Sequence, residues 1–273
     1  MSASAQPTRA WEPFTPRGVA AFAGARFRRL LLVQCIVALL AAAAIIWFVY
    51  NGCFPAVATA IQKLPAAGEI HSGRLDWHGR SPELLAEGRF LALDVDLDHS
   101  NQIGATADVQ IEFGRETVRV SSLFGYRDWP YPRDYVIAFN RNELEPRWGA
   151  WTAELLVIAG AATVICLLLT WSLLATLYFL PVWMLGFFTN RDLNFRESWR
   201  FAGAALMPGA LLMAAAVLFY GIGFLNLVSF GFTFGAHLFI GWIYLFVGLL
   251  FVPQAPATAS QGNPFRQRRK ERE

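Results

Sequence analysis

Four long apolar stretches dominate the pattern of hydrophobic and polar positions along this chain. Two of them precede Arg200, and no Lys, Arg, Asp or Glu occurs between Arg200 and Arg266. A bilayer core needs about 20 helical residues for each crossing, so the uncharged stretch has room for two crossings and a short turn. The pattern predicts an α-helical integral membrane protein with transmembrane helices at 30–50, 151–180, 201–221 and 235–252.

The segment 51–150 has a different period. In residues 90–98 apolar side chains alternate with three aspartates, and alternation recurs at 109–113 and 118–120 with a glycine between them. Residues 68–77, with Gly73 in the middle, are a weaker strand candidate. A period of two broken by glycine is typical of strands joined by a hairpin. We therefore expect a small β-rich extracytoplasmic domain inserted between helices 1 and 2.

The remaining segments are connections and termini. Asn194 followed by Glu197 has the spacing of a capping box, which predicts that the third helix begins there. Pro181 is expected to end or bend the second helix, and Pro208 to bend the third. The other predicted segments are an N-terminal arm at 1–29, an interfacial loop at 181–200, an outer turn at 222–234 and a basic tail at 253–273.

Charge predicts the topology. Residues 1–29 carry five arginines against one glutamate, and the tail is also basic, whereas 51–148 holds ten basic and fourteen acidic residues. Short segments rich in Lys and Arg stay in the cytoplasm, so both termini are expected there. The first apolar stretch is too long for the 7–15-residue core of a cleaved signal peptide. The residues that set this topology are Arg26, Arg28, Arg29, Arg266, Arg268 and Arg269.

Asp94, Asp96 and Asp98 resemble the start of a calcium-binding loop. The sixth residue counted from Asp94 is His99, where that motif has glycine, and the twelfth is Ala105, where it has a bidentate glutamate. Like charges on one strand face are destabilising unless they are solvated, paired or bridged by a cation. We expect a solvated strand face, with a weak divalent-cation site on the three aspartates as the alternative.

Three residues of the last apolar stretch stand out. His237 is the only ionisable side chain of the classes Lys, Arg, His, Asp and Glu between Arg200 and Arg266, and such groups inside a membrane are candidates for function. The structural alternative is a neutral histidine bonded to a backbone carbonyl or to water. Gly231 and Gly235 have the G-x-x-x-G spacing that lets helices approach closely. We expect them to pack the last two helices together, with a homo-oligomer contact as the alternative.

The layout resembles a bacterial family of uncharacterised multi-pass membrane proteins, sometimes labelled maltodextrin-utilisation proteins and related to Yip1-like membrane families. The similarity rests on Pro16-Arg17, the basic run 26–29, Leu64-Pro65, Gly73-Arg74-Leu75 and the segment 194–200. It implies an extracytoplasmic β-rich insert after helix 1 and a bacterial cytoplasmic (inner) membrane location. It transfers no catalytic residue.

These features favour a non-enzymatic inner-membrane protein, which acts as an accessory, scaffold or sensing subunit and contacts an envelope partner through its outer domain. The alternative is a component of a transport system or a small-solute permease. No zinc spacing, P-loop or dinucleotide fingerprint occurs in the sequence, so we expect no cofactor and no catalytic residue. The expected partners are the lipid bilayer, a membrane or periplasmic protein and a second copy of the chain, but no nucleic acid.

Overall fold

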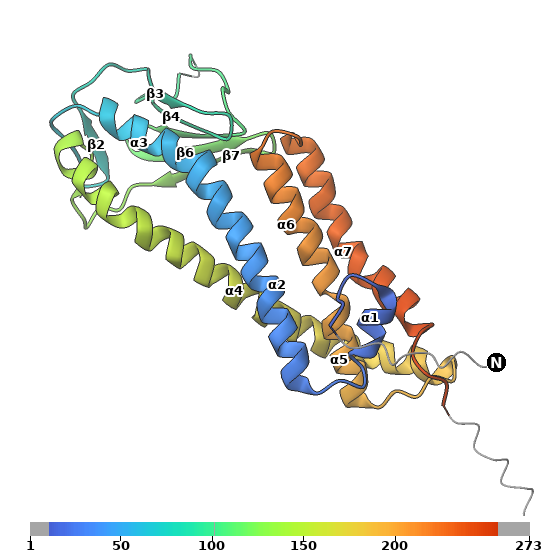
Figure 1. The fold of residues 1–273 in the computed structure, drawn as a ribbon. Coiled ribbons are helices and arrows are strands. Elements are labelled where there is room, and N and C mark those ends of the chain that lie inside the picture. The colour runs from blue at the N-terminus through green and yellow to red at the C-terminus, as the bar shows by residue number, and fades with distance from the viewer. Residues whose placement is uncertain (1–10, 101, 256–273) are drawn as a thin grey trace, which may run out of the picture. The chain divides into compact units, whose positions relative to one another are not determined.

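A computed structural model of the chain describes residues 11–100 and 102–255. The chain folds into two compact units. Within the described residues, the helical unit comprises 11–41, 163–213 and 232–255, and the β unit comprises 42–162 and 214–231. Figure 1 labels α1 to α7 and the strands β2, β3, β4, β6 and β7.

Four helical segments of the described chain are long and apolar enough to cross a membrane, namely Phe27–Lys63, Arg141–Phe188, Phe195–Gly221 and Leu227–Leu249. A β-sheet domain lies between the first and the second in the sequence, as the hydrophobic pattern predicts. Arg26, Arg28 and Arg29 are exposed around the start of the first segment. Arg266, Arg268 and Arg269 lie outside the described residues, as does most of the basic tail.

The first segment does not stop at residue 50. Helix α2 (Phe27–Phe48) passes through one π-helical turn, Val49–Cys53, into α3 (Phe54–Lys63). Pro55 lies in the first turn of α3, directly after the π-helical turn, and the helix continues past it. The boundary expected at 50/51 is therefore wrong, because no residue there breaks the helix, and residues 51–63 of the expected β-rich segment are helical.

Helix α4 (Arg141–Phe188) is longer than the predicted 151–180 at both ends. It starts early because the Asn140 side chain accepts a hydrogen bond from the backbone N–H of Glu143 at 3.0 Å, which is the geometry of an N-cap. Pro181 does not end the helix, which continues for seven residues beyond it.

The third segment begins at the predicted capping box. In α5 (Phe195–Ala205) the Asn194 side chain accepts from the N–H of Glu197, and the Glu197 carboxylate accepts from the N–H of Asn194, both at 3.0 Å. Helix α6 (Met207–Gly221) follows after Leu206, with Pro208 in its first turn. Proline disfavours helix at the residue before it, which agrees with a break at this point.

Helix α7 (Leu227–Leu249) begins eight residues earlier than the predicted fourth span. Asn226 caps it, since its side chain accepts from the N–H of Ser229 at 2.8 Å. The turn before α7 is therefore only 222–226, shorter than the predicted 222–234, because aromatic residues of the segment continue the helix.

The β unit contains two sheets. A three-stranded antiparallel sheet has the order β2-β1-β8, from β1 (Gly68–His71), β2 (Arg74–Trp77) and β8 (Ile137–Ala138). A five-stranded sheet has the order β3-β4-β5-β6-β7, from β3 (Glu83–Glu87), β4 (Leu91–Val95), β5 (Val109–Phe113), β6 (Thr117–Ser122) and β7 (Gly125–Pro130). The predicted hairpin is β5–β6, and the weaker strand candidate at 68–77 is two paired strands, β1 and β2, rather than one.

One face of the five-stranded sheet forms the apolar core of the β unit. Leu93 and Val95 of β4 are buried in a cluster with Leu85 of β3 and with Ala60 of α3. Alternation along each strand places the intervening residues on the opposite face. The strands β4 and β5 are parallel, so the chain has to cross between them through residues 96–108. The path of that crossover determines which residues cover the second face of the sheet.

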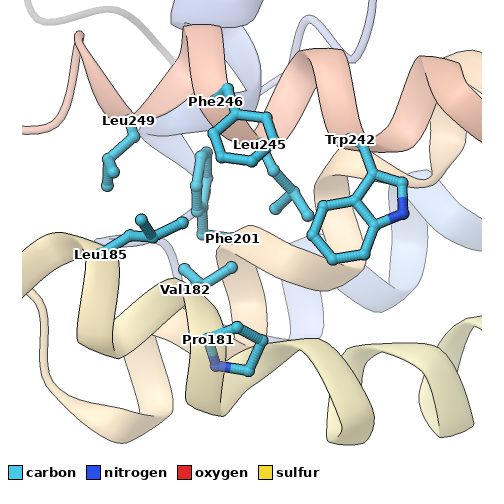
Figure 2. A pocket seen from close by; sticks show the side chains of 8 residues that line it. All are labelled: Pro181, Val182, Leu185, Phe201, Trp242, Leu245, Phe246 and Leu249. Carbon is cyan, nitrogen blue, oxygen red and sulfur yellow. The ribbon is translucent and has the colours of Figure 1, made fainter.

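The helical unit has its own core, in which Phe22, Phe201 and Met207 are fully buried. Figure 2 shows Phe201 among apolar side chains of α4 and α7, where a gap of about 10 Å³ remains. That volume holds about one water molecule and has apolar walls. The gap is therefore a packing defect beside Pro181 rather than a ligand site.

Small residues pack this core, but not those predicted. A Cβ atom on Gly209 would lie 3.0 Å from the backbone oxygen of His237, and one on Gly248 would lie 2.9 Å from the Phe201 ring. No described atom lies within 4 Å of a Cβ placed on Gly235. In the β unit, the nearest contact of such an atom on Gly231 is the Phe124 ring at 3.7 Å. Gly231 and Gly235 therefore do not make the close contact that was expected between the last two helices.

Candidate functional site

The aspartates singled out in the sequence do not form a solvated strand face. Asp94 is fully buried and Asp96 is 2% exposed, whereas the Asp98 side chain is 77% exposed. Asp94 lies on the sheet face opposite the apolar core, and the crossover 96–108 returns over that face. The expectation of a solvated face is therefore wrong, because a non-local connection covers it.

The three aspartates bind different partners. Asp94 accepts a hydrogen bond from the Gln110 side chain at 2.9 Å, Asp96 accepts one from the Ser100 hydroxyl at 2.7 Å, and Asp98 pairs with Arg115 at 3.4 Å. Among the described residues no group of three or more His, Cys, Asp or Glu side chains is placed to hold a metal ion. The calcium-like spacing thus does not bring the three carboxylates to one point.

Asp94 is the least satisfied member of this face. Its Oδ1 atom receives the Gln110 hydrogen bond, but its Oδ2 atom is buried without a partner among the described residues. The pKa of Asp94 is raised to about 6, chiefly by burial and also by the carboxylates of Glu112 and Asp96, while the Gln110 hydrogen bond opposes the rise. The site therefore contains a carboxyl group that exchanges its proton near neutral pH.

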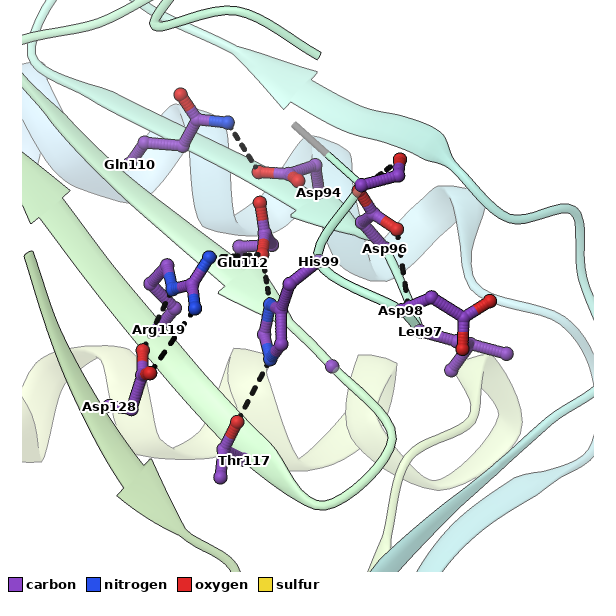
Figure 3. A network of polar contacts seen from close by, with 12 residues as sticks. Asp94, Asp96, Leu97, Asp98, His99, Gln110, Glu112, Thr117, Arg119 and Asp128 are labelled. Atoms are coloured by element: carbon purple, nitrogen blue, oxygen red, sulfur yellow. Dashed lines mark hydrogen bonds and ion pairs between the residues drawn. The ribbon is translucent and has the colours of Figure 1, made fainter. Parts of the chain in front are cut away.

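His99, on the crossover, reaches across the sheet. Its Nδ1 atom contacts the Glu112 carboxylate, and its Nε2 atom lies 2.9 Å from the Thr117 hydroxyl, as Figure 3 shows. His99 is in the left-handed region at φ 51°. The ring thereby links β5 to β6 and fixes the crossover over the polar face. No local pattern in the sequence predicts this contact, because the parallel pairing of β4 and β5 brings the three residues together.

Arg119 extends the arrangement to the next strand. Its guanidinium lies 3.8 Å from Glu112 and 2.8 Å from Asp128 of β7. The hydrogen bond from Arg119 lowers the pKa of Asp128, and the same bond raises the pKa of Arg119. Figure 3 shows the resulting polar network, which runs across β4, β5, β6 and β7 and consists of Asp94, His99, Gln110, Glu112, Thr117, Arg119 and Asp128.

The order hydroxyl, imidazole, carboxylate in Thr117, His99 and Glu112 resembles the nucleophile, base and orienting group of a hydrolase. Glu112, however, also faces Arg119, which satisfies part of its charge. A cavity of about 270 Å³ in the same unit is lined by Leu93 and Phe113, whose neighbours in the strands are Asp94 and Glu112. By alternation that cavity lies on the other face of the sheet. The network is therefore best described as a polar layer that holds the crossover on the sheet.

The last turn of α6 and the residues that follow it contact the segments of the β unit that precede β4 and β5. The Tyr220 hydroxyl donates to Asp108 at 2.5 Å, and Arg89 donates to the backbone oxygens of Leu225 at 3.1 Å and of Gly223 at 3.4 Å. The Phe90 ring packs against Tyr220 with ring centroids 4.8 Å apart. A helix end is thus held by both polar and aromatic contacts from the sheet side.

Strand β7 is an uncovered edge of the five-stranded sheet. All six of its residues are exposed, and Tyr126 and Trp129 are 69% and 46% exposed. The backbone N–H of Tyr131 donates to Glu116 at 3.0 Å, and this bond fixes which β7 groups face β6. Because bonded and non-bonded pairs alternate, the N–H groups of Tyr126 and Asp128 point to the free edge. We call this surface the β7 edge.

His237 lies in the helical unit and is partly exposed. Its Nδ1 atom contacts the backbone oxygen of Phe234 one turn earlier, and its ring lies 5.0 Å from the Phe234 ring. A backbone carbonyl is therefore its partner, as in the structural alternative.

A comparison of the chain with models of protein families, with curated proteins and with solved structures found no match.

Proposed function

We propose that the chain is a multi-pass protein of a bacterial cytoplasmic membrane, with both termini in the cytoplasm and the β unit's sheets outside. Two features support membrane insertion. Apolar side chains such as Leu169, Leu173 and Leu177 of α4 are about 60% exposed, and they need an apolar solvent. The arginines at the start of α2 are those that the positive-inside rule keeps in the cytoplasm.

Within that membrane the protein acts as a non-enzymatic accessory or sensing subunit that binds an envelope protein. The observation that carries this proposal is the β7 edge. It presents N–H groups of Tyr126 and Asp128 that do not pair with β6, beside exposed aromatic rings. Natural sheets protect such edges with charges, bulges or covering segments, and an extended strand from a partner satisfies them by joining the sheet. The occupant that we propose is such a strand.

Binding at the β7 edge would also affect the residues that join α6 to α7. The β7 edge adjoins β6, which carries Arg119, and lies two strands from β5, which carries Glu112. Glu112 contacts His99 on the crossover, and that crossover ends at Asp108, which bonds Tyr220. All of these residues belong to the β unit. A partner strand that shifts the sheet therefore acts on the residues that join α6 to α7, which is the property required of a sensing subunit.

The test is site-specific photo-crosslinking of the full-length protein in cells. A photoreactive residue replaces Trp129 on β7 or, as the matched control, Glu87 on β3, which forms the opposite edge of the same sheet. We expect a discrete protein adduct from position 129 alone. An adduct that contains a second copy of the chain would mean that the β7 edge binds another copy of the chain rather than an envelope protein. Adducts of equal yield from both positions, or none, would exclude the β7 edge.

A second variant separates strand addition from aromatic contact. Tyr126→Pro removes an N–H that does not pair with β6, so the sheet keeps its ladder while the edge loses a donor. Tyr126→Ala removes the ring and keeps the donor. Strand addition predicts that the proline variant loses the adduct formed from position 129, while the alanine variant keeps part of it. Solute flux by the purified protein in liposomes would instead support the transport alternative.

A further inference from the structure

A groove in the helical unit combines aromatic walls with two guanidinium groups. It has a volume of about 460 Å³ and is lined by Phe27 of α2, Phe179 of α4, and Phe195, Arg196, Trp199 and Arg200 of α5. Ligand cavities in proteins span about 300–1,000 Å³ and combine apolar walls with a few polar groups. The groove has that size and that composition.

The aromatic walls are fixed by contacts of their own. Trp199 donates its indole N–H to the Thr176 hydroxyl at 3.1 Å, and its ring lies 5.9 Å from the Phe27 ring. Phe179 and Phe195 contact each other edge to face at 6.0 Å. Phe27 and Phe195 nevertheless remain about half exposed. The groove therefore keeps its shape without an occupant and offers apolar surface to one.

Its two cations are placed for an anion. Arg196 and Arg200 are four residues apart on α5, so they lie on the same face of the helix. Arg196 is exposed, and the only described carboxylate paired with Arg200 is that of Glu197 at 4.0 Å. The Nε atom of Arg200 is buried and has no hydrogen-bond partner among the described residues. An anion in the groove would instead meet the terminal nitrogens of the two guanidinium groups, because both arginines line the groove.

The chemistry of the groove selects one occupant. A phosphate diester accepts hydrogen bonds from two guanidinium groups, and acyl chains attached to it would lie along the exposed rings. Basic pockets between helices at the cytoplasmic level bind anionic lipid headgroups. We propose that Arg196 and Arg200 hold the phosphate of one anionic phospholipid, with its chains against Phe27, Phe179 and Trp199. This inference rests on membrane insertion, but it does not depend on the role of the β7 edge.

The experiment is native mass spectrometry of the full-length protein in a neutral detergent, titrated with phosphatidylglycerol or with phosphatidylcholine. The wild type should retain one phosphatidylglycerol in preference to phosphatidylcholine. Arg196→Gln with Arg200→Gln should lower that affinity by about tenfold or more, as expected from the loss of charge-assisted hydrogen bonds. The matched control is Arg26→Gln with Arg28→Gln, which removes the same charge from exposed positions outside the groove.

Each outcome decides a separate point. Equal lipid retention by the wild type and the groove variant would overturn the lipid site, and so would equal losses in both double variants, which would indicate diffuse charge. Because Arg200 is partly buried, Arg196→Gln alone is measured as well, with thermal unfolding as the check of folding. If inorganic phosphate raises the temperature of thermal unfolding as much as phosphatidylglycerol does, the groove binds a soluble anion rather than a lipid. Release of the protein by alkaline carbonate would contradict membrane insertion and thereby the proposed function.

Discussion

The Tyr220 hydroxyl donates a hydrogen bond to the Asp108 carboxylate over 2.5 Å, although the two residues are 112 positions apart in the chain. Tyr220 is 6% exposed, so the bond is shielded from water. It joins the last turn of α6 to the end of the crossover over the polar network.

Loss of that bond should destabilise the β unit. Tyr220→Phe keeps the ring packed on Phe90 but leaves the Asp108 carboxylate without its donor. Removing one partner of a charged hydrogen bond costs about 1.5–3 kcal/mol, and we expect a decrease of this size in the free energy of unfolding. Denaturant unfolding in detergent measures it. Tyr135→Phe removes an exposed hydroxyl and should leave stability unchanged; equal effects of both variants would refute the assignment.

The stability of the β unit should depend on the charge of Asp94. Its pKa is raised to about 6, so the folded state binds the proton more tightly than the unfolded state does. The stabilisation is complete below the ordinary aspartate pKa near 3.8 and is lost as the pH rises through 6. Asp94→Asn keeps an acceptor for Gln110 and should therefore stabilise the protein at pH 7 by up to about 3 kcal/mol.

The same substitution should have little effect near pH 4, where wild-type Asp94 is protonated in the folded state. Unfolding curves of both proteins between pH 4 and pH 8 test this dependence. Asp98→Asn is the control, because Asp98 is exposed and its surface ion pair contributes little. A constant difference between Asp94→Asn and the wild type at every pH would show that charge is not the cause.

Glu112 should matter more for folding than an exposed glutamate of the same unit. It is 5% exposed and faces both His99 and Arg119. Glu112→Gln removes the negative charge that His99 and Arg119 both contact. Removing one partner of a buried ion pair costs about 3–5 kcal/mol. We expect at least about 2 kcal/mol here because His99 is partly exposed.

The matched control for that variant is Glu116→Gln, which breaks the Arg74–Glu116 pair, where both side chains are more than 60% exposed. Such surface pairs contribute about 0–1 kcal/mol. Limited proteolysis of the crossover 96–108 gives a second readout, since His99 attaches that segment to the sheet. Faster cleavage in Glu112→Gln alone is the expected result, and equal cleavage in both variants would contradict it.

Two glycines should respond in opposite ways to a larger side chain. Gly209→Val places a Cβ atom 3.0 Å from the backbone oxygen of His237, which cannot move aside without shifting α7. Gly235→Ala meets open space and gains helix propensity. We expect a lower melting temperature for the first variant and an unchanged or higher one for the second. Destabilisation by Gly235→Ala alone would restore the G-x-x-x-G interpretation.

The local features of this fold could be predicted, because their signals lie within a few residues of one another. The capping box of Asn194 and Glu197 and the alternation in β4 and β5 are of this kind. The start of α4 could also have been found, because Asn140 and Glu143 repeat the same spacing. The hydrophobic pattern instead predicts a start at residue 151, because the first turns of α4 are polar.

The polar network could not be predicted in the same way. Alternation correctly separated Asp94 from Leu93, but the burial of Asp94 depends on a crossover whose path is set by the parallel pairing of β4 and β5. The docking of Tyr220 on Asp108 joins segments that no periodicity relates. Such contacts become visible only once the strand order is known.

The segment 214–231 belongs to the same compact unit as the strands, although residues 163–213 of the helical unit separate it in the chain from the rest of that unit. During synthesis the strands leave the ribosome long before Tyr220 and Gly223 do. The β unit is therefore complete only after α6 and the segment that follows it have been synthesised. Chains truncated between α4 and α6 lack the donor that bonds Asp108, and proteases should cleave their strands faster than those of the full-length chain.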